Sequence, residues 1–214
     1  MMRVSLTYER RGRDDGLMSS RVNQKERTRQ AIVAATRDLI RTGGEVTMPA
    51  VAKSALVSEA TAYRYFPDLA SLLREALAGV WPSPEVALAP VAGSGDPVER
   101  VACATEALFR HVLTYQGGVR AMIAATITRP DGAQMRPGHR FGLIDEALRP
   151  LAADTAVLDQ LKRDLAVVIS AEALFTLTDL CGLSPEDAIA SAVHTARTLT
   201  QAAIGKNRLA AARV

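Results

Sequence analysis

The chain has 214 residues, of which 48% are hydrophobic and only 4% aromatic, and its formal net charge is +3. This length allows one or two domains with a real core, and a composition rich in alanine and leucine favours closely packed helices. The first twenty residues are polar and charged, unlike a signal peptide, and no apolar run reaches the roughly 20 residues that span a membrane. Because no period-2 stretch indicates a strand, the sequence predicts an all-α protein. Because it shows no signal peptide and no membrane span, we expect a cytoplasmic protein without a membrane partner.

Positive charge is concentrated in the first part of the chain. Residues 1–80 hold 13 Lys and Arg against 9 Asp and Glu, whereas the remainder holds 13 against 14. Binding to the phosphate backbone of DNA requires such a local surplus. The surplus is small, and it counts because it coincides with the motif described below.

The chain shows no catalytic or metal-binding pattern. Cys103 and Cys181 lie far apart and predict two reduced thiols rather than metal ligands. His111, His139 and His194 fall on three different predicted helices, without the spacing of a metal site. A glycine-rich phosphate loop and a GxSxG motif are both absent. We therefore expect no enzymatic activity, no metal and no cofactor.

The N-terminal region begins with a segment that lacks periodicity. Residues 1–20 are expected to form a disordered arm, and Met18 is an alternative translation start. The arm is either an unstructured tail or a basic segment that lies along DNA. Residues 23–42 predict the first long helix, with Asn23 as its N-cap. In its first turns Arg27 and Arg29 face either solvent or DNA phosphate.

Residues 47–73 predict two short helices joined by a tight corner and followed by a third helix. Thr47, Ser58 and Asp68 each precede a helical stretch and can cap its N-terminus. The third helix is expected to extend to about residue 79. Two short helices at a fixed corner are the plan of a helix-turn-helix. The small side chains of residues 60–62 would let the second helix enter a major groove.

Residues 27–73 resemble the DNA-binding domain of the TetR-like repressor family. The matching positions are Thr47, Val51-Ala52, Val57-Ser58, the run from Thr61 to Pro67, which includes Tyr63, Tyr65 and Phe66, and Leu72-Leu73. The sequence departs from the family at Leu56, where the corner usually has glycine, and at Leu69, where a phosphate-binding lysine is usual. The second departure is expected to weaken DNA binding somewhat.

The resemblance implies a domain organisation and a set of DNA contacts. Residues 21–80 would form the three-helix DNA-binding domain, and residues 81–214 a helical domain for ligand binding and dimerisation. Base edges would be read by the start of the second helix, and phosphates would be held by hydroxyl and basic groups around it. The predicted DNA-binding residues are Thr47, Lys53, Ser58, Glu59, Ala60, Thr61, Tyr63, Arg64 and Tyr65.

The C-terminal part follows a linker predicted over residues 82–96, which is rich in proline and glycine. Asp96 and Ser184 are N-caps that precede a proline. Gly117-Gly118 is expected to stop a helix. Residues 129–138 are expected to form a loop. Helices are predicted over residues 97–115, 119–128, 139–148, 154–181 and 184–205.

Side chains on several of these helices could converge on a small-molecule cavity. The candidates are Trp81, Phe109, His111, Val112, Tyr115, Met122, Ile123, Thr126 and Phe141. An ordinary hydrophobic core explains the same residues without a ligand. In the resembled family this region binds ligands, and the last two helices pair with their copies in a dimer. The resemblance thus implies a homodimer through residues 154–181 and 184–205.

These observations predict a ligand-responsive transcriptional regulator, a repressor that binds a pseudo-palindromic operator in double-stranded DNA as a homodimer. A small apolar effector would release it, provided that the effector binds the DNA-free state more tightly. Two alternatives stay open. One is an activator or a regulator without a ligand, and the other is a helical carrier or enzyme whose DNA-binding motif no longer functions.

Overall fold

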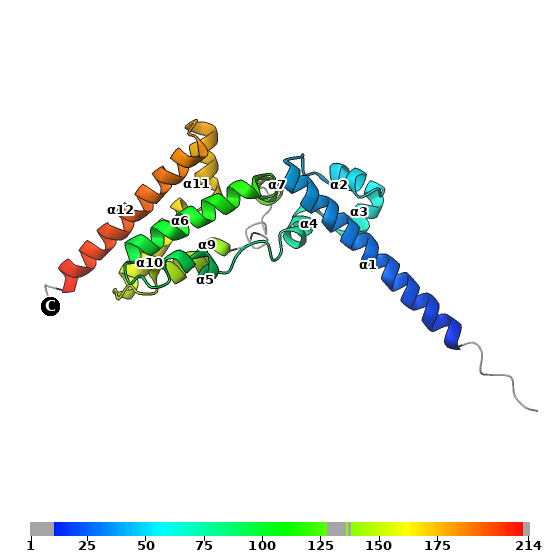
Figure 1. Ribbon diagram of the computed structural model, residues 1–214, viewed down its shortest axis with the longest axis horizontal. Helices are drawn as coiled ribbons and strands as arrows, with labels where there is room; N and C mark the ends of the chain where they lie inside the picture. Colours follow the sequence, from blue (N-terminus) through cyan, green and yellow to red (C-terminus); the bar gives the residue numbers. More distant parts are fainter. Residues whose placement is uncertain (1–10, 128–135, 137, 212–214) are drawn as a thin grey trace, which may run out of the picture.

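The computed structural model describes residues 11–127, 136 and 138–211, and within these ranges every regular element is helical. The all-α prediction is therefore confirmed. A small N-terminal lobe contains α1 to α4, and a larger lobe contains α5, α6 and α9 to α12, with α7 lying between them (Figure 1). Among the helices described here, none is long and apolar enough to cross a membrane. Most of the loop predicted over residues 129–138 lies outside the described residues.

The N-terminal lobe has the predicted three-helix plan behind one long helix. Its elements are α1 (Arg11–Thr42), α2 (Met48–Ser54), α3 (Glu59–Tyr65) and α4 (Leu69–Ala76). The predicted N-caps are confirmed by hydrogen bonds from Ala50 N–H to Thr47 Oγ1 (3.3 Å), from Thr61 N–H to Ser58 Oγ (3.2 Å) and from Ser71 N–H to Asp68 Oδ1 (2.7 Å). These local bonds fix where each short helix begins.

The first helix is longer than the sequence analysis predicted. It begins at Arg11, so the prediction of a helix start at Asn23 was wrong, and residues 11–20 of the predicted disordered arm are helical. Once the packed part around Ile32 and Ile40 has formed, each further residue adds a backbone hydrogen bond at little cost. No proline interrupts residues 11–22. Residues 1–10 lie outside the described part of the chain.

The corner between α2 and α3 forces a leucine into a glycine conformation. Leu56 has φ +57°, the only positive φ among the described non-glycine residues. The N–H of Val57 donates to Ala52 O (3.0 Å) and that of Leu56 to Lys53 O (3.2 Å), the hydrogen-bond pattern of a Schellman cap. The Leu56 side chain is 92% exposed, so its packing does not compensate for the strain.

The segment after α4 is more ordered than a linker. Helix α4 ends at Ala76 instead of extending to residue 79, because the chain turns at Gly79 with φ +74°. Within the predicted linker lie α5 (Pro84–Ala87), capped by Ser83, and the 3₁₀ turn η1 (Ala89–Val91). Helix α5 packs on α6 and α9, and Leu88 is buried in the core. The predicted linker therefore belongs to the larger lobe.

The larger lobe contains α6 (Pro97–Thr114), α7 (Gln116–Ile127), α9 (His139–Leu148), α10 (Thr155–Val168), α11 (Ala171–Phe175), the π-helical turn η2 (Thr176–Leu180) and α12 (Pro185–Ala211). Two predictions were wrong. Gly117-Gly118 lies inside α7, and the preceding helix, α6, already ends at Thr114. The helix predicted over residues 154–181 breaks at Ile169, and Ser170 caps a new helix by accepting the Ala173 N–H at 3.0 Å.

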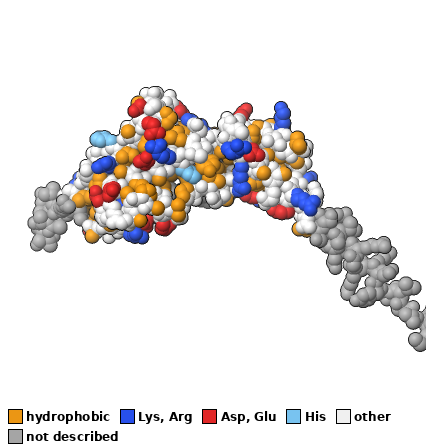
Figure 2. Space-filling model, viewed as in Figure 1, with side chains coloured by type: hydrophobic (Ala, Val, Ile, Leu, Met, Phe, Trp, Pro, Cys, Tyr) orange, Lys and Arg blue, Asp and Glu red, His pale blue; other side chains and the backbone are white. Residues whose placement is uncertain are grey.

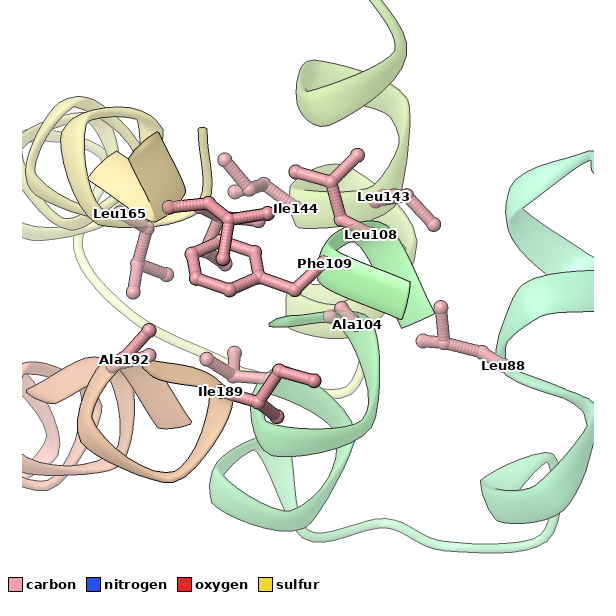
Figure 3. Close-up of a cluster of buried hydrophobic side chains, with 14 of the residues drawn as sticks. Leu88, Ala104, Leu108, Phe109, Leu143, Ile144, Leu165, Ile189 and Ala192 are labelled. Atoms are coloured by element: carbon pink, nitrogen blue, oxygen red, sulfur yellow. The ribbon is translucent and has the colours of Figure 1, made fainter. Parts of the chain in front are cut away.

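The core of this lobe is organised around α6. Phe109 is fully buried, and Figure 3 shows it surrounded by Ile144, Leu165 and Ile189 from three other helices. Arg100 is also buried. Its guanidinium donates to the carbonyl oxygens of Val91, Glu146 and Ala147 at 2.7 to 3.2 Å and pairs with the Glu146 carboxylate at 2.7 Å. These contacts tie η1, α6 and α9 together.

The two lobes meet where α7 packs on α1 and α4. The buried side chains at this joint are Ile40, Val46, Ala70, Leu73, Leu77 and Met122. Gly118 permits the close approach, because a Cβ atom there would lie only 2.8 Å from Cδ1 of Ile40. Carbon atoms pack at about 3.5–4.0 Å, so a larger residue at this position would force the Ile40 side chain to move.

Replacing Leu56 with glycine should stabilise the protein. Glycine adopts a positive φ without the Cβ clash, so we expect Leu56→Gly to raise the free energy of unfolding by about 1 kcal/mol in urea titrations. Leu56→Ala is the matched control, because alanine keeps the Cβ atom and should leave stability nearly unchanged. An equal gain in both variants would show that the exposed leucine side chain, not the backbone, was the cause.

Candidate nucleic-acid interface and ligand cavity

Helix α3 presents one side to solvent and buries the other. Ala62 and Phe66 are buried in the lobe core, whereas Glu59, Ala60 and Arg64 are exposed. Thr61 is half-buried, and its hydroxyl oxygen accepts a 2.9 Å hydrogen bond from Ser58. At the start of α3, Glu59 is thus followed by the small side chains of Ala60 and Thr61, which leave the backbone accessible.

Hydroxyl and basic groups surround this exposed surface. Tyr63 is 48% exposed, while Tyr65 is half-buried and packs against the lobe core. The Arg64 guanidinium lies 5.6 Å from the centre of the Tyr65 ring. Lys53 is exposed in the last turn of α2, and Thr47 is half-buried because it caps that helix. Lys and Arg side chains project from this lobe in Figure 2.

Two basic residues of α1 have structural partners instead of an open face. Arg29 pairs with Glu75 of α4, and its guanidinium lies 4.6 Å from the centre of the Phe66 ring. Arg37 donates to the Ala76 carbonyl at 2.8 Å and so satisfies the end of α4. The Glu75 carboxylate already neutralises the charge of Arg29, so the structure does not favour the alternative in which Arg29 binds a DNA phosphate. Arg27 is exposed.

Leu69 stands where the resembled family usually has a lysine. In this structure its side chain is half-buried and packs against both the core of the N-terminal lobe and the joint with α7. The substitution therefore replaces an expected phosphate contact with apolar packing between the lobes.

A small cavity of about 70 Å³ opens between the joint and the larger lobe. Its lining comes from the end of α4 and from α6, α7, α9 and α11, namely Leu77, Trp81, Leu108, Val112, Val119, Met122, Ile123, Arg136, His139, Arg140, Ser170, Ala171 and Glu172. This volume is less than the about 300–1,000 Å³ of typical small-molecule sites, so a ligand of that size must displace lining side chains. Most of the lining is apolar, with charged groups at one end.

The charged end consists of two arginines and one carboxylate. Arg136 donates to Glu172 Oε1 at 2.7 Å and to Thr126 Oγ1 at 2.8 Å. Arg140 donates to the Ala166 carbonyl at 3.3 Å and approaches Glu172 Oε2 at 3.4 Å. Glu172 reaches this place because the chain breaks at Ser170. Neither arginine was among the residues predicted for the cavity.

Trp81 forms one wall of the cavity within a row of rings. It stacks on His139 (centroids 4.8 Å apart) and leans on His111 (4.3 Å), which in turn contacts Tyr115 (4.8 Å). Burial lowers the pKa of His111, and the nearby His139 lowers it further. Burial of its ring also lowers the pKa of His139, although the residue as a whole remains exposed. Both shifts favour the neutral imidazole.

The structure brings only some of the candidate cavity residues together. Trp81, Val112, Met122 and Ile123 line the cavity, and the hydroxyl of Thr126 holds Arg136 behind it. His111 and Tyr115 stand in the row behind Trp81. Phe109 is buried in the core instead, and Phe141 is 57% exposed on the outer surface. Helical periodicity shows which residues share one side of a helix. It does not show whether that side faces the cavity, the core or solvent, and for this reason the predictions for Phe109 and Phe141 were wrong.

Comparison with known proteins supports the interpretation of the N-terminal lobe. Residues 32–76 match a family model described as bacterial regulatory proteins, tetR family. The match covers the second part of α1 and all of α2, α3 and α4. No curated protein matches the chain. Among the described residues, no group of three His, Cys, Asp or Glu side chains is placed to hold a metal ion.

His111 and His139 should make the protein less stable in mild acid. Because folding lowers their pKa, the unfolded state binds protons more tightly, and stability falls as pH drops through about 6.5. We expect the free energy of unfolding in urea to decline from about pH 7.5 to about pH 5.5, and less steeply in His111→Gln and His139→Gln. His194→Gln, at an exposed position of α12, should keep the wild-type slope. Equal slopes in all four proteins would contradict this origin.

Proposed function

We propose that this chain, a DNA-binding transcriptional regulator of the tetR family, is a homodimeric repressor that a small molecule releases from its operator. It would act in the cytoplasm, where bacterial DNA lies. The observation that carries the proposal is the position of the cavity. Leu77 and Met122 belong both to the cavity lining and to the joint that holds the N-terminal lobe.

The exposed side of α3 supports a role in reading the major groove. Glu59, Ala60 and Thr61 would approach base edges, where their type decides which sequence is preferred. The remaining predicted contacts, which are Thr47, Lys53, Ser58, Tyr63, Arg64 and Tyr65, would hold phosphates and fix the register. Thr47 accepts a backbone hydrogen bond as a cap, and its hydroxyl can still donate to a phosphate oxygen. The Ser58 hydroxyl could donate to a phosphate only by giving up the hydrogen bond that it donates to Thr61.

The shared side chains give a physical path for release. Trp81 follows α4 by a few residues and lines the cavity, so an occupant would contact the segment that leads directly into the DNA-binding lobe. An occupant that requires Leu77 or Met122 to move would change how α4 packs on α7. Release then follows to the extent that the occupant binds the DNA-free arrangement more tightly than the DNA-bound one.

Exposed apolar groups support a dimer through the helices predicted for it. Val167 on α10 and Leu180 at the end of η2 are 73% and 82% exposed. Val167 also lines an open groove between α10, α11 and α12, together with Val168, Leu177 and Ala192. A second copy would cover this surface, and two-fold symmetry would place two α3 helices on the two halves of a pseudo-palindrome.

Selection of bound sequences from random double-stranded DNA tests the proposal. We expect a pseudo-palindromic site whose half-sites are about one helical turn apart, with affinity that falls steeply as salt rises. Sedimentation of the free protein should give a dimer. Thr61→Ala should alter the preferred bases. Binding without sequence preference, or a single half-site bound by a monomer, would contradict the proposal.

The Tyr63 hydroxyl should contribute to affinity without contributing to specificity. Loss of one phosphate contact costs about 1 kcal/mol, so we expect Tyr63→Phe to weaken binding about fivefold on every sequence alike. Tyr115→Phe, which removes the hydroxyl of a half-buried tyrosine in the larger lobe, serves as the control. Competition assays on the selected site and on random DNA provide the measurement. A changed base preference in Tyr63→Phe would contradict a role limited to phosphate.

A further inference from the structure

We propose that the cavity takes an amphipathic monoanion, a molecule with an apolar body and one carboxylate-like group that binds Arg140. This inference rests on the proposed function, because it names the class of effector for the same cavity. It also changes the expectation drawn from the sequence, which was an apolar effector. The change follows from three charged residues that the fold brings to one end of the cavity.

The charge balance at that end favours an anion. Of the described lining residues, Arg136 and Arg140 are cationic and Glu172 alone is anionic. The three side chains are only 23%, 25% and 38% exposed, respectively. An excess positive charge that is partly removed from water is unfavourable until an anion binds beside it. A cationic occupant would instead have to compete with two arginines for one carboxylate.

The two arginines differ in how firmly they are held. Arg136 makes two short hydrogen bonds, to Glu172 and Thr126, which fix its guanidinium. Among the described residues, Arg140 makes one long hydrogen bond of 3.3 Å, to a carbonyl, and lies 3.4 Å from Glu172 without bonding it well. Glu172 Oε2 is buried and has no hydrogen-bond partner among the described residues. Arg140 is therefore the group that can reorient and bind a carboxylate through two N–H donors.

A second donor and the apolar lining define the rest of the ligand. The indole N–H of Trp81 is buried and lacks an acceptor in the described part of the chain. A buried donor without a partner is rare, and it suits a ligand that carries oxygen acceptors. Beyond the charged end, Val112, Met122 and Ile123 offer an apolar surface. Burial of the ligand body there would supply most of the affinity, while Arg140 selects its charge.

The only tryptophan of the chain lines the cavity, so intrinsic fluorescence reports its occupancy. We would titrate the full-length protein with decanoate, decanamide and decylamine, three probes of equal chain length, all below the concentrations at which they form micelles. Decanoate should bind most tightly and decylamine most weakly. Tighter binding of decylamine than of decanoate, or no binding of any probe, would overturn the proposal.

Variants assign the preference to Arg140. Arg140→Gln should weaken decanoate binding about tenfold or more and leave decanamide binding unchanged, because the amide carries no charge. Glu172→Gln should strengthen decanoate binding by removing the competing carboxylate. Arg149→Gln is the matched control, since Arg149 is exposed and lies outside the cavity. Circular dichroism would confirm that each variant is folded. An equal loss in Arg140→Gln and Arg149→Gln would contradict the proposal.

Repeating the titration on the protein bound to its selected operator separates the two proposals. Decanoate that changes Trp81 fluorescence and dissociates the DNA supports both. Decanoate that changes the fluorescence with the charge preference and Arg140 dependence described above, but leaves the DNA bound, supports the ligand class and contradicts release by a ligand.

Discussion

Close packing of α7 on α1 and α4 is the constraint on which the arrangement of the molecule depends. The approach is possible because Gly118 has no Cβ atom, so Ile40 of α1 can lie directly against the α7 backbone. Leu73 of α4 and Met122 of α7 are buried in the same joint. The helix-turn-helix is thus held in one orientation to the larger lobe. A ligand that changes this orientation must therefore change how α7 packs on α1 and α4.

The cavity is placed to act on that packing. Leu77 and Met122 face it as well as the joint, and Trp81 connects it to the end of α4. On the other side, buried Arg100 ties α6, α9 and η1 together through several short hydrogen bonds. We infer that an occupant contacts rigidly held helices on the α6–α9 side, and on the other side contacts side chains that are shared with the N-terminal lobe. Since packed interfaces are not continuously deformable, a small displacement at the shared side chains is enough to favour a different packing.

The sequence predicted the parts of the fold that local chemistry decides. The caps at Thr47, Ser58 and Asp68 act on backbone groups three residues away, so they are visible in any short window of sequence. Gly118 was misjudged for the opposite reason. Its neighbour Ile40 lies far away in the chain, and only the packed structure shows that glycine here serves helix contact and not helix termination. The break at Ser170 was missed because an apolar stripe continued through it.

That break also explains why the sequence could not predict the charged end of the cavity. Arg136, Arg140 and Glu172 come from α11 and from the chain around the start of α9, and none of them belongs to an apolar stripe or a known motif. In a single helix over residues 154–181, Glu172 would have been one acidic residue near a stripe, with no defined partner. The cap at Ser170 starts a new helix, and this helix gives the Glu172 carboxylate two arginine neighbours. One carboxylate does not balance two guanidinium groups. The helix break at Ser170, which the apolar pattern did not predict, therefore determines which charge the cavity prefers.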